Sequence, residues 1–195
     1  MTATRLLVKS ILEKAVHYKW TIQGFGMLRL YLSPTTRIHV WNSRYVIPGV
    51  SDIHDHPWDF TSTIVAGELK NARLKFEPGL SGTYRGSKIL CGAGAHLVGK
   101  LSGDEPEFFH RCTVASEAYY AGDSYRQHRS EVHQSFPADG TVTIVERVMS
   151  EDADHAMVYW PRNEEWVSAE PRPATSEEIV DITGYSLHRW FYEKQ

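Results

Sequence analysis

Two histidines separated by one residue stand in the segment SDIHDHPWDF, which covers residues 51–60. Side chains of a β-strand point alternately to its two faces, so residues two apart share a face. In an extended segment, His54 and His56 would therefore aim at one point, and Asp55 would point away. Because imidazole nitrogens are common ligands of metal ions, this spacing indicates part of a metal site.

A metal site needs further ligands from other parts of the chain, and His133 is the best candidate. It lies in SEVHQ, ahead of a turn at 137–140 and a strand-like segment, TVTIVERVM, at 141–149. We predict that a strand from the opposite side of a barrel brings it opposite the His-x-His pair. Asp59 follows the pair closely and could supply a carboxylate. Alternatively, Asp59 caps a turn or orients a ligand histidine from outside the metal shell.

The hydrophobic pattern predicts the elements that must position these residues. Residues 4–18 have the period of an amphipathic helix. From Met27 onward, short alternating segments rich in branched and aromatic residues predict β-strands. Residues 78–110 hold seven of the 14 glycines and are interpreted as an elaborated loop with one or two short strands. Residues 150–195 form an extension whose last helix is capped by Thr175 or Ser176.

Composition limits the class of protein. The 195 residues suit one domain over 1–195, with a core at about 27–149. The net charge of −3 argues against nucleic acid as a partner. The N-terminal residues have neither a signal-peptide nor a membrane-span pattern, and two cysteines give no disulfide framework, so we expect a cytoplasmic protein with no membrane partner.

The His-x-His segment resembles the first motif of the cupin superfamily. That motif is Gly, five residues, His-x-His, three or four residues, Glu, six residues, Gly. This chain has Gly49, four residues, His54 and His56, two residues, Asp59, seven residues and Gly67. The heptad HDHPWDF is also similar to a subgroup of small bacterial and phage cupins.

A second segment resembles the other cupin motif, which is Gly, five residues, Pro-x-Gly, two residues, His, three residues, Asn. Here Gly122 is the first glycine, and His133 stands at the histidine position. His128, Ser130 and Pro137 occupy the Pro, Gly and Asn positions. The end-to-end spacing matches, while those three identities differ.

The resemblance implies an all-β fold, a cupin-type double-stranded β-helix (a jelly-roll barrel) with N- and C-terminal helices. It implies that His54, His56 and His133 are metal ligands, with Asp59 at the position of the family's Glu ligand. The implied cofactor is a divalent metal, first Fe(II), with Mn, Ni or Zn as alternatives. A homodimer is expected on the same ground.

Three functions follow as hypotheses. The first is an Fe(II)-dependent oxygenase of a small molecule, similar to the cupin thiol dioxygenases. The second is a metal-independent sugar isomerase or epimerase with His and Tyr as acid and base, for which Tyr119, Tyr120 and Tyr125 are candidates. The third is a ligand-binding module without catalysis.

Substrate-binding candidates come from the same segments. Trp58 could wall the pocket, and Tyr125 lies near the second motif. Arg126, Arg129 or Arg147 could bind a substrate carboxylate, and Arg147 faces the barrel only if Val145 does. His128 is expected to be exposed or at the mouth of the barrel. No role is assigned to the remaining histidines, which are His17, His39, His96, His110, His155 and His188.

Overall fold

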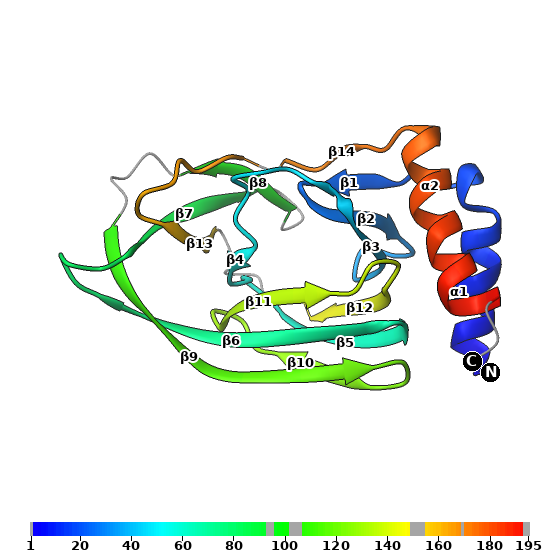
Figure 1. Cartoon of the computed structure of the whole chain (residues 1–195), viewed down its shortest axis with the longest axis horizontal. Coiled ribbons are helices and arrows are strands. Elements are labelled where there is room, and N and C mark those ends of the chain that lie inside the picture. Colours follow the sequence, from blue (N-terminus) through cyan, green and yellow to red (C-terminus); the bar gives the residue numbers. More distant parts are fainter. Residues whose placement is uncertain (1, 93–95, 102–106, 149–154, 169, 193–195) are drawn as a thin grey trace.

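The computed structural model describes residues 2–92, 96–101, 107–148, 155–168 and 170–192. Within these ranges the chain forms two seven-stranded sheets and two α-helices (Figure 1). In spatial order the first sheet contains β10 (Ser124–Gln127), β5 (Asp59–Ala66), β12 (Val142–Val148), β3 (Thr36–Val46), β2 (Phe25–Tyr31), β1 (Thr21–Gln23) and β14 (Arg172–Pro173).

The second sheet closes on itself. Its spatial order is β13 (His155–Pro161), β4 (Ile53–His54), β11 (Val132–Pro137), β6 (Glu68–Pro78), β9 (Glu107–Tyr120), β7 (Tyr84–Gly92) and β8 (His96–Leu101). Because β13 also pairs with β7, six of the described strands form a closed barrel, and only β8 lies outside the ring. Stacked Phe76 and Tyr159, with Phe109 against their edges, help to fill its interior.

In its central strands, the first sheet is buried on both faces. Alternate residues of β2 and β3, such as Leu28 and Val40, belong to a large apolar cluster with the helices. The residues between them, such as Met27, His39 and Trp41, line a cavity on the opposite face. The two-residue period of a strand thus divides each strand into a helix-facing row and a cavity-facing row.

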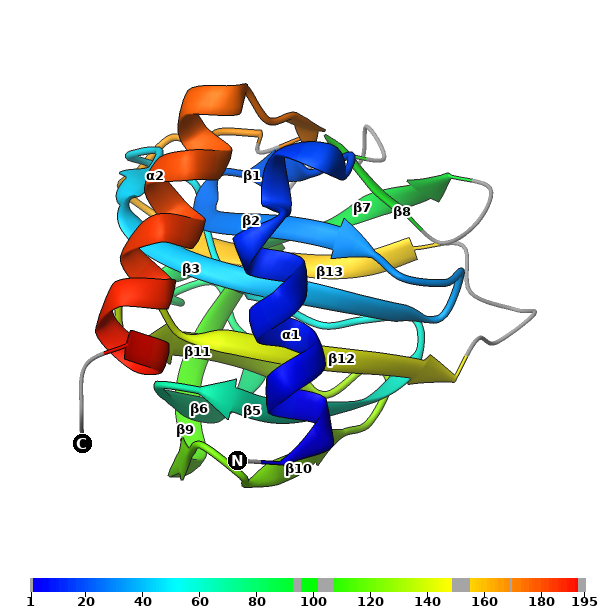
Figure 2. The same cartoon turned by 90° about the vertical axis from the view of Figure 1, so that its right-hand side faces the viewer.

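Two helices cover the outer face of this sheet. Helix α1 (Ala3–Glu13) places Val8, Ile11 and Leu12 on one stripe, at the spacing expected of an amphipathic helix. A short 3-10 turn, η1 (Ala15–His17), follows it. Helix α2 (Ser176–Ser186) continues into a π-helical turn, η2 (Leu187–Tyr192). Figure 2 shows α1 lying across β2, β3 and β12, with α2 beside it.

Local sequence signals account for the start of α2. The Thr175 side chain accepts a hydrogen bond from the backbone N–H of Glu178, whose carboxylate accepts one from the N–H of Thr175. This reciprocal capping box satisfies two backbone donors that a helix leaves unpaired. The Glu178 carboxylate also accepts hydrogen bonds from Arg172, which ties the helix to β14.

The prediction of an all-β jelly-roll fold with terminal helices is confirmed. The N-terminal helix ends at Glu13, earlier than the expected residue 18, because the chain tightens into η1. The prediction of an elaborated loop with one or two short strands at 78–110 is right that strands occur there, but they occupy more of the described segment than expected: β7, β8 and the start of β9. Glycines in that segment obscured the strand pattern; at Gly86, for example, a β-carbon would come within 2.8 Å of Phe109 and Tyr159. No helix among the described residues is long and apolar enough to cross a membrane.

Two motif glycines test how tightly the turns are packed. Gly67, between β5 and β6, has φ +82°, and Gly122, between β9 and β10, has φ +105°. A β-carbon at Gly67 would lie 2.9 Å from the Cα of Thr141, whereas one at Gly122 would meet nothing within 4 Å. We expect Gly122→Ala to lower the free energy of unfolding by about 1 kcal/mol, from backbone strain alone. Gly67→Ala should cost at least about 2 kcal/mol, because Thr141 must also move.

Urea unfolding of the two alanine variants measures this difference. Both substitutions place the same side chain at a left-handed position, so Gly122→Ala controls for strain. Equal losses of stability in the two variants would show that the close contact with Thr141 does not contribute to the destabilisation of Gly67→Ala.

Candidate metal centre

Strand pairing brings the ligand candidates His54 and His133 together. His54 ends β4, His133 lies in β11, and the two residues are direct antiparallel partners. His133 therefore comes from a neighbouring strand, and the prediction of a strand on the opposite side of the barrel is wrong. His56 follows β4 by two residues and turns its ring to the same side. Asp55 points away, as predicted, and its carboxylate accepts a hydrogen bond of 2.7 Å from the Met157 backbone N–H.

The three imidazoles form a compact cluster. One ring nitrogen from each of His54, His56 and His133 lies within 4.8 Å of the others, and within the described part of the chain no other group of three or more potential ligands is this close. The Nε2 atoms of His56 and His133 are 3.2 Å apart. Two nitrogen ligands on one ion, each at about 2.1 Å, are separated by roughly 3 Å. The observed spacing therefore fits a shared metal ion.

Hydrogen bonds orient two of the rings. The Nδ1 atom of His54 lies 2.9 Å from the Asp52 carbonyl oxygen, and that of His133 lies 3.0 Å from Oδ1 of Asn71. A carbonyl oxygen can only accept, so each Nδ1 carries a proton and each Nε2 keeps a free lone pair. Metal-binding histidines are commonly held in this way, by a donor bond from the nitrogen that does not bind the metal.

The hydrogen bond to His133 belongs to a longer buried chain. Asn71 donates from Nδ2 to Oε1 of Gln127, at 3.2 Å. Gln127 in turn donates from Nε2 to both the backbone and the carboxylate oxygens of Glu131. These bonds leave Oδ1 of Asn71 to accept from His133, so the network fixes the tautomer of that ring as well as its position.

Burial keeps the three imidazoles neutral. It lowers the pKa of His54 to about 4, with a smaller opposing effect from the hydrogen bond to Asp52. The pKa values of His56 and His133 lie well below 6.5, mainly through burial and then through the neighbouring histidines. Metal ions bind the neutral imidazole, so the cluster is ready to bind one at neutral pH.

Asp59 lies outside this cluster. It is the first residue of β5, where Phe60 and Ser62 line the cavity, so alternation turns Asp59 to the other face. Its carboxylate accepts hydrogen bonds from the Arg126 side chain at 3.0 Å and from the Arg129 backbone N–H at 2.8 Å. These donors lower its pKa, the Arg129 bond having the larger effect.

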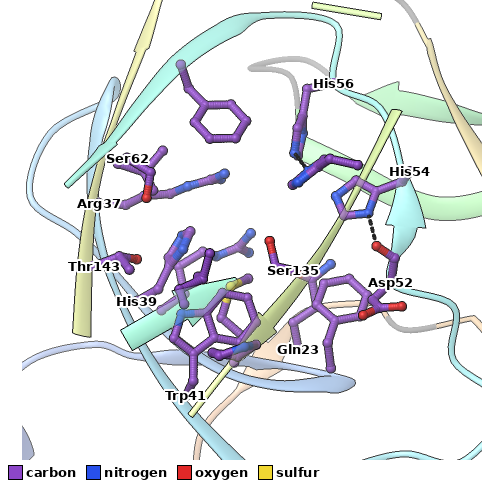
Figure 3. Close-up of a pocket in the computed structure, with 18 of the residues that line it drawn as sticks. Gln23, Arg37, His39, Trp41, Asp52, His54, His56, Ser62, Ser135 and Thr143 are labelled. Carbon is purple, nitrogen blue, oxygen red and sulfur yellow. Dashed lines mark hydrogen bonds between the residues drawn. The ribbon is translucent and has the colours of Figure 1, made fainter. Parts of the chain in front are cut away.

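A cavity of about 100 Å³ adjoins the histidines, between the two sheets. Figure 3 shows His54 and His56 at one side, with Arg37, Ser62 and Thr143 projecting from the other. Of the predicted substrate-binding residues, Trp58 and Tyr125 line this space. Such an enclosed space, largely apolar with a few polar groups, is typical of small-molecule sites.

Arg147 is placed by the register of β12. Val145 lines the cavity, and Arg147, two residues on, is buried on the same face with its guanidinium 4.8 Å from the Trp58 ring centre. Arg126 is exposed and pairs with Asp59. His128 is also exposed, as predicted, with 63% of its side-chain surface accessible.

Several residues of the site were not singled out by the sequence. Asn71 and Gln127 are polar residues within strands, with no spacing motif to mark them. Arg29 and Arg37 alternate with leucine and isoleucine, which favours an exposed polar face. His39 was assigned no role, yet it is buried and lines the cavity. Arg29, Arg37 and His39 share one reason: β2 and β3, from which they come, are covered on both faces.

No protein-family model and no curated protein matches the chain. The closed barrel and the three-histidine cluster are compatible with a cupin-like, metal-binding jelly roll. Three histidines this close together could hold a divalent metal, and they come from β4, the residues just after it, and β11.

These buried histidines predict how the stability of the metal-free protein depends on pH. Their folded pKa values lie below the value of about 6.5 expected in the unfolded chain, so below that pH the unfolded chain binds more protons. Their contribution to stability is complete above about pH 6.5 and is lost as the pH falls, down to about 4 for His54. The free energy of unfolding in urea should therefore fall between about pH 7 and about pH 5.

A variant separates these groups from other titrating residues. His54→Asn removes one of these groups and should reduce the pH dependence. An unaltered pH dependence in His54→Asn would contradict the assignment.

Proposed function

We propose that this protein is a mononuclear metal-dependent enzyme that acts on a small molecule, with Fe(II)-dependent oxygenation as its reaction class. One observation carries the proposal: three neutral imidazoles meet beside an enclosed cavity. Within the described residues no carboxylate or thiolate joins them. A site with three protein ligands keeps coordination positions open, as catalytic sites do. Bound iron would supply those positions to the substrate and to dioxygen.

The residues of this chain would prepare the site for that chemistry. Asn71 orients His133, and the Asp52 carbonyl orients His54. Trp58 and Phe60 lie against His56, with ring centres 5.3 and 5.1 Å from its ring, and shield the cluster from water. A water-poor site strengthens charge interactions between bound groups and prevents side reactions.

A second candidate function is the isomerisation or epimerisation of a sugar without metal chemistry. Tyr125 favours it, because its phenol lies in the cavity and bonds with Ser62 and Ser135. Burial raises its pKa, so the phenol stays protonated and can act as a general acid. Tyr119 stacks on Tyr125 outside the cavity lining, and Tyr120 is exposed.

Elemental analysis of purified protein tests the metal site. We expect one equivalent of metal in the unaltered protein and a loss of at least tenfold in occupancy in His54→Ala and His133→Ala. Asp59→Ala is the matched control and should retain the metal, because Asp59 faces Arg126 instead. Unchanged metal content in His133→Ala would show that His133 in β11 is not a metal ligand.

The hydrogen bond to His133 gives a finer test of the same site. Asn71→Leu removes the acceptor of the His133 N–H, and should weaken metal binding by roughly 10- to 100-fold. Asn71→Asp keeps an acceptor there and should bind metal nearly as well as the unaltered protein. Competition with a chelator measures both, and equal affinities for the two variants would contradict the orienting role.

Oxygen consumption separates the two candidate functions. Iron-loaded protein should consume dioxygen in the presence of a small thiol substrate, and His56→Ala should not. Conversion of a sugar by metal-free protein, lost in Tyr125→Phe, would favour the second candidate.

A further inference from the structure

Three arginines lie on the inward row of the first sheet. Arg29 is in β2, Arg37 in β3 and Arg147 in β12. Their strands are neighbours, since Arg37 pairs with Val145, two residues before Arg147, while Arg29 pairs with His39. Arg29 and Arg37 line the cavity itself, and Arg147 lies behind Trp58.

These guanidinium groups are almost fully buried. Arg29, Arg37 and Arg147 are 7%, 6% and 6% exposed. Arginine is very seldom buried to this degree without a carboxylate or another anion beside it. In the described part of the chain, none of the three has an acidic side chain within ion-pair distance.

Neutral contacts satisfy only part of their hydrogen-bonding capacity. Arg29 donates from Nε to the Thr21 hydroxyl at 3.3 Å, and Arg147 donates to the Pro34 carbonyl. Arg37 has the Tyr31 hydroxyl beside it. The Nε atoms of Arg37 and Arg147, and one terminal nitrogen of Arg147, have no partner within the described structure. Unpaired buried donors of this kind mark a place for an acceptor from outside the chain.

The charge balance leads to the same conclusion. Burial, followed by repulsion from Arg29, lowers the pKa of Arg37 to about 10, so it remains charged at neutral pH. His39, which faces these arginines, is neutral because burial and their charges keep its pKa well below 6.5. Asp52 lines the cavity, but its carboxylate accepts a hydrogen bond from Gln134 and is not among the charges that act on the arginines. The cavity therefore holds a net positive charge.

We propose that this cavity binds a small anion, whose carboxylate or phosphate group is held by Arg29 and Arg37 of the first sheet, across the cavity from His54 and His133 of the second sheet. Figure 3 shows Arg37 on the side of the cavity opposite His54 and His56. Planar guanidinium groups bind both oxyanions through paired hydrogen bonds. A space of about 100 Å³, walled by Phe25, Met27 and Trp41, favours a small molecule with an apolar part over a nucleotide or a polymer. That this anion is the substrate rests on the proposed function; that it binds does not.

Titration calorimetry on metal-free protein tests the binding. The probes are inorganic phosphate, acetate and succinate, with succinamide as the neutral control. We expect phosphate or a carboxylate to bind, and succinamide to bind at least tenfold more weakly. The comparison of phosphate with succinate decides between the two oxyanions. Failure of all three anions to bind with a Kd below about 10 mM would overturn the proposal.

Arginine variants place the anion within the fold. Arg29→Gln and Arg37→Gln should each weaken anion binding at least tenfold, whereas Arg44→Gln should not change it, since Arg44 is exposed and pairs with Asp181. Unchanged affinity in Arg37→Gln would overturn the site.

A stability measurement guards against misfolding of the variants. Arg37→Met removes an uncompensated buried charge, so the ligand-free variant should unfold at the same temperature as the unaltered protein or higher. It should lose the rise in unfolding temperature that the anion gives the unaltered protein. If the anion still raises the unfolding temperature of the variant by the same amount, Arg37 does not hold it.

One further variant separates this proposal from the metal proposal. His133→Ala removes a proposed metal ligand and leaves Arg29 and Arg37 in place. This variant should therefore lose the metal and still bind the anion. If metal never binds but anions do, only the metal-dependent function fails. If metal binds and no anion does, only the anion site fails.

Discussion

The antiparallel pairing of β4 with β11 is the constraint on which the site depends. It sets His54 directly against His133, and the two-residue period of the extended chain then brings His56 to the same side. A shift of one residue in this register would turn His133 to the other face and bring Val132 in its place. The apolar neighbours oppose such a shift, because Val132 packs inside the closed barrel with Leu74 and Ile53. The barrel core thus holds the histidines in place.

With a divalent ion on the histidines, the cavity would combine two kinds of positive charge in an enclosed space. The guanidinium groups are permanent charges, and a divalent ion on the histidines would add to them. Charges of one sign in a poorly hydrated space repel strongly, and Arg37 already lowers the pKa values of His54 and His56. An anion between the two walls would reduce the repulsion acting on the arginines and on a metal ion bound by the histidines. This arrangement would link the binding of a metal to the binding of an anion through electrostatics alone.

Much of the site could be predicted from residue spacing, and the failures have physical causes. Alternation predicts the shared direction of His54 and His56 because it needs only an extended chain. His133 required a long-range pairing, for which motif spacing was the available guide. Asp59 lies apart because the strand β5 begins there in the outward phase. Asp59 resembles the family's Glu ligand in its approximate position, but its distance from the His-x-His pair differs by one residue. On a strand, a difference of one residue turns the side chain to the other face.

The burial of Arg29 and Arg37 could not be predicted from the sequence, for a different reason. In the segment MLRLYL, leucines alternate with polar residues, a pattern that normally indicates one buried face and one exposed face. Here α1 and α2 cover the leucine face, and the second sheet covers the other. Whether a sheet has a solvent face is decided by elements far away in the chain, and no local pattern reports it. The same holds for His39, whose strand neighbours Ile38 and Val40 face the helices.

The double covering of the first sheet has a consequence for how the protein can change over time. In β2, β3 and β12, even-numbered positions such as Leu28, Val40 and Val142 pack against the helices. Odd-numbered positions such as Met27, His39 and Thr143 face the cavity. Selection for a new ligand can therefore act on one set of codons while the other maintains folding. Adjacent residues of one strand are, in this sense, under separate evolutionary pressures.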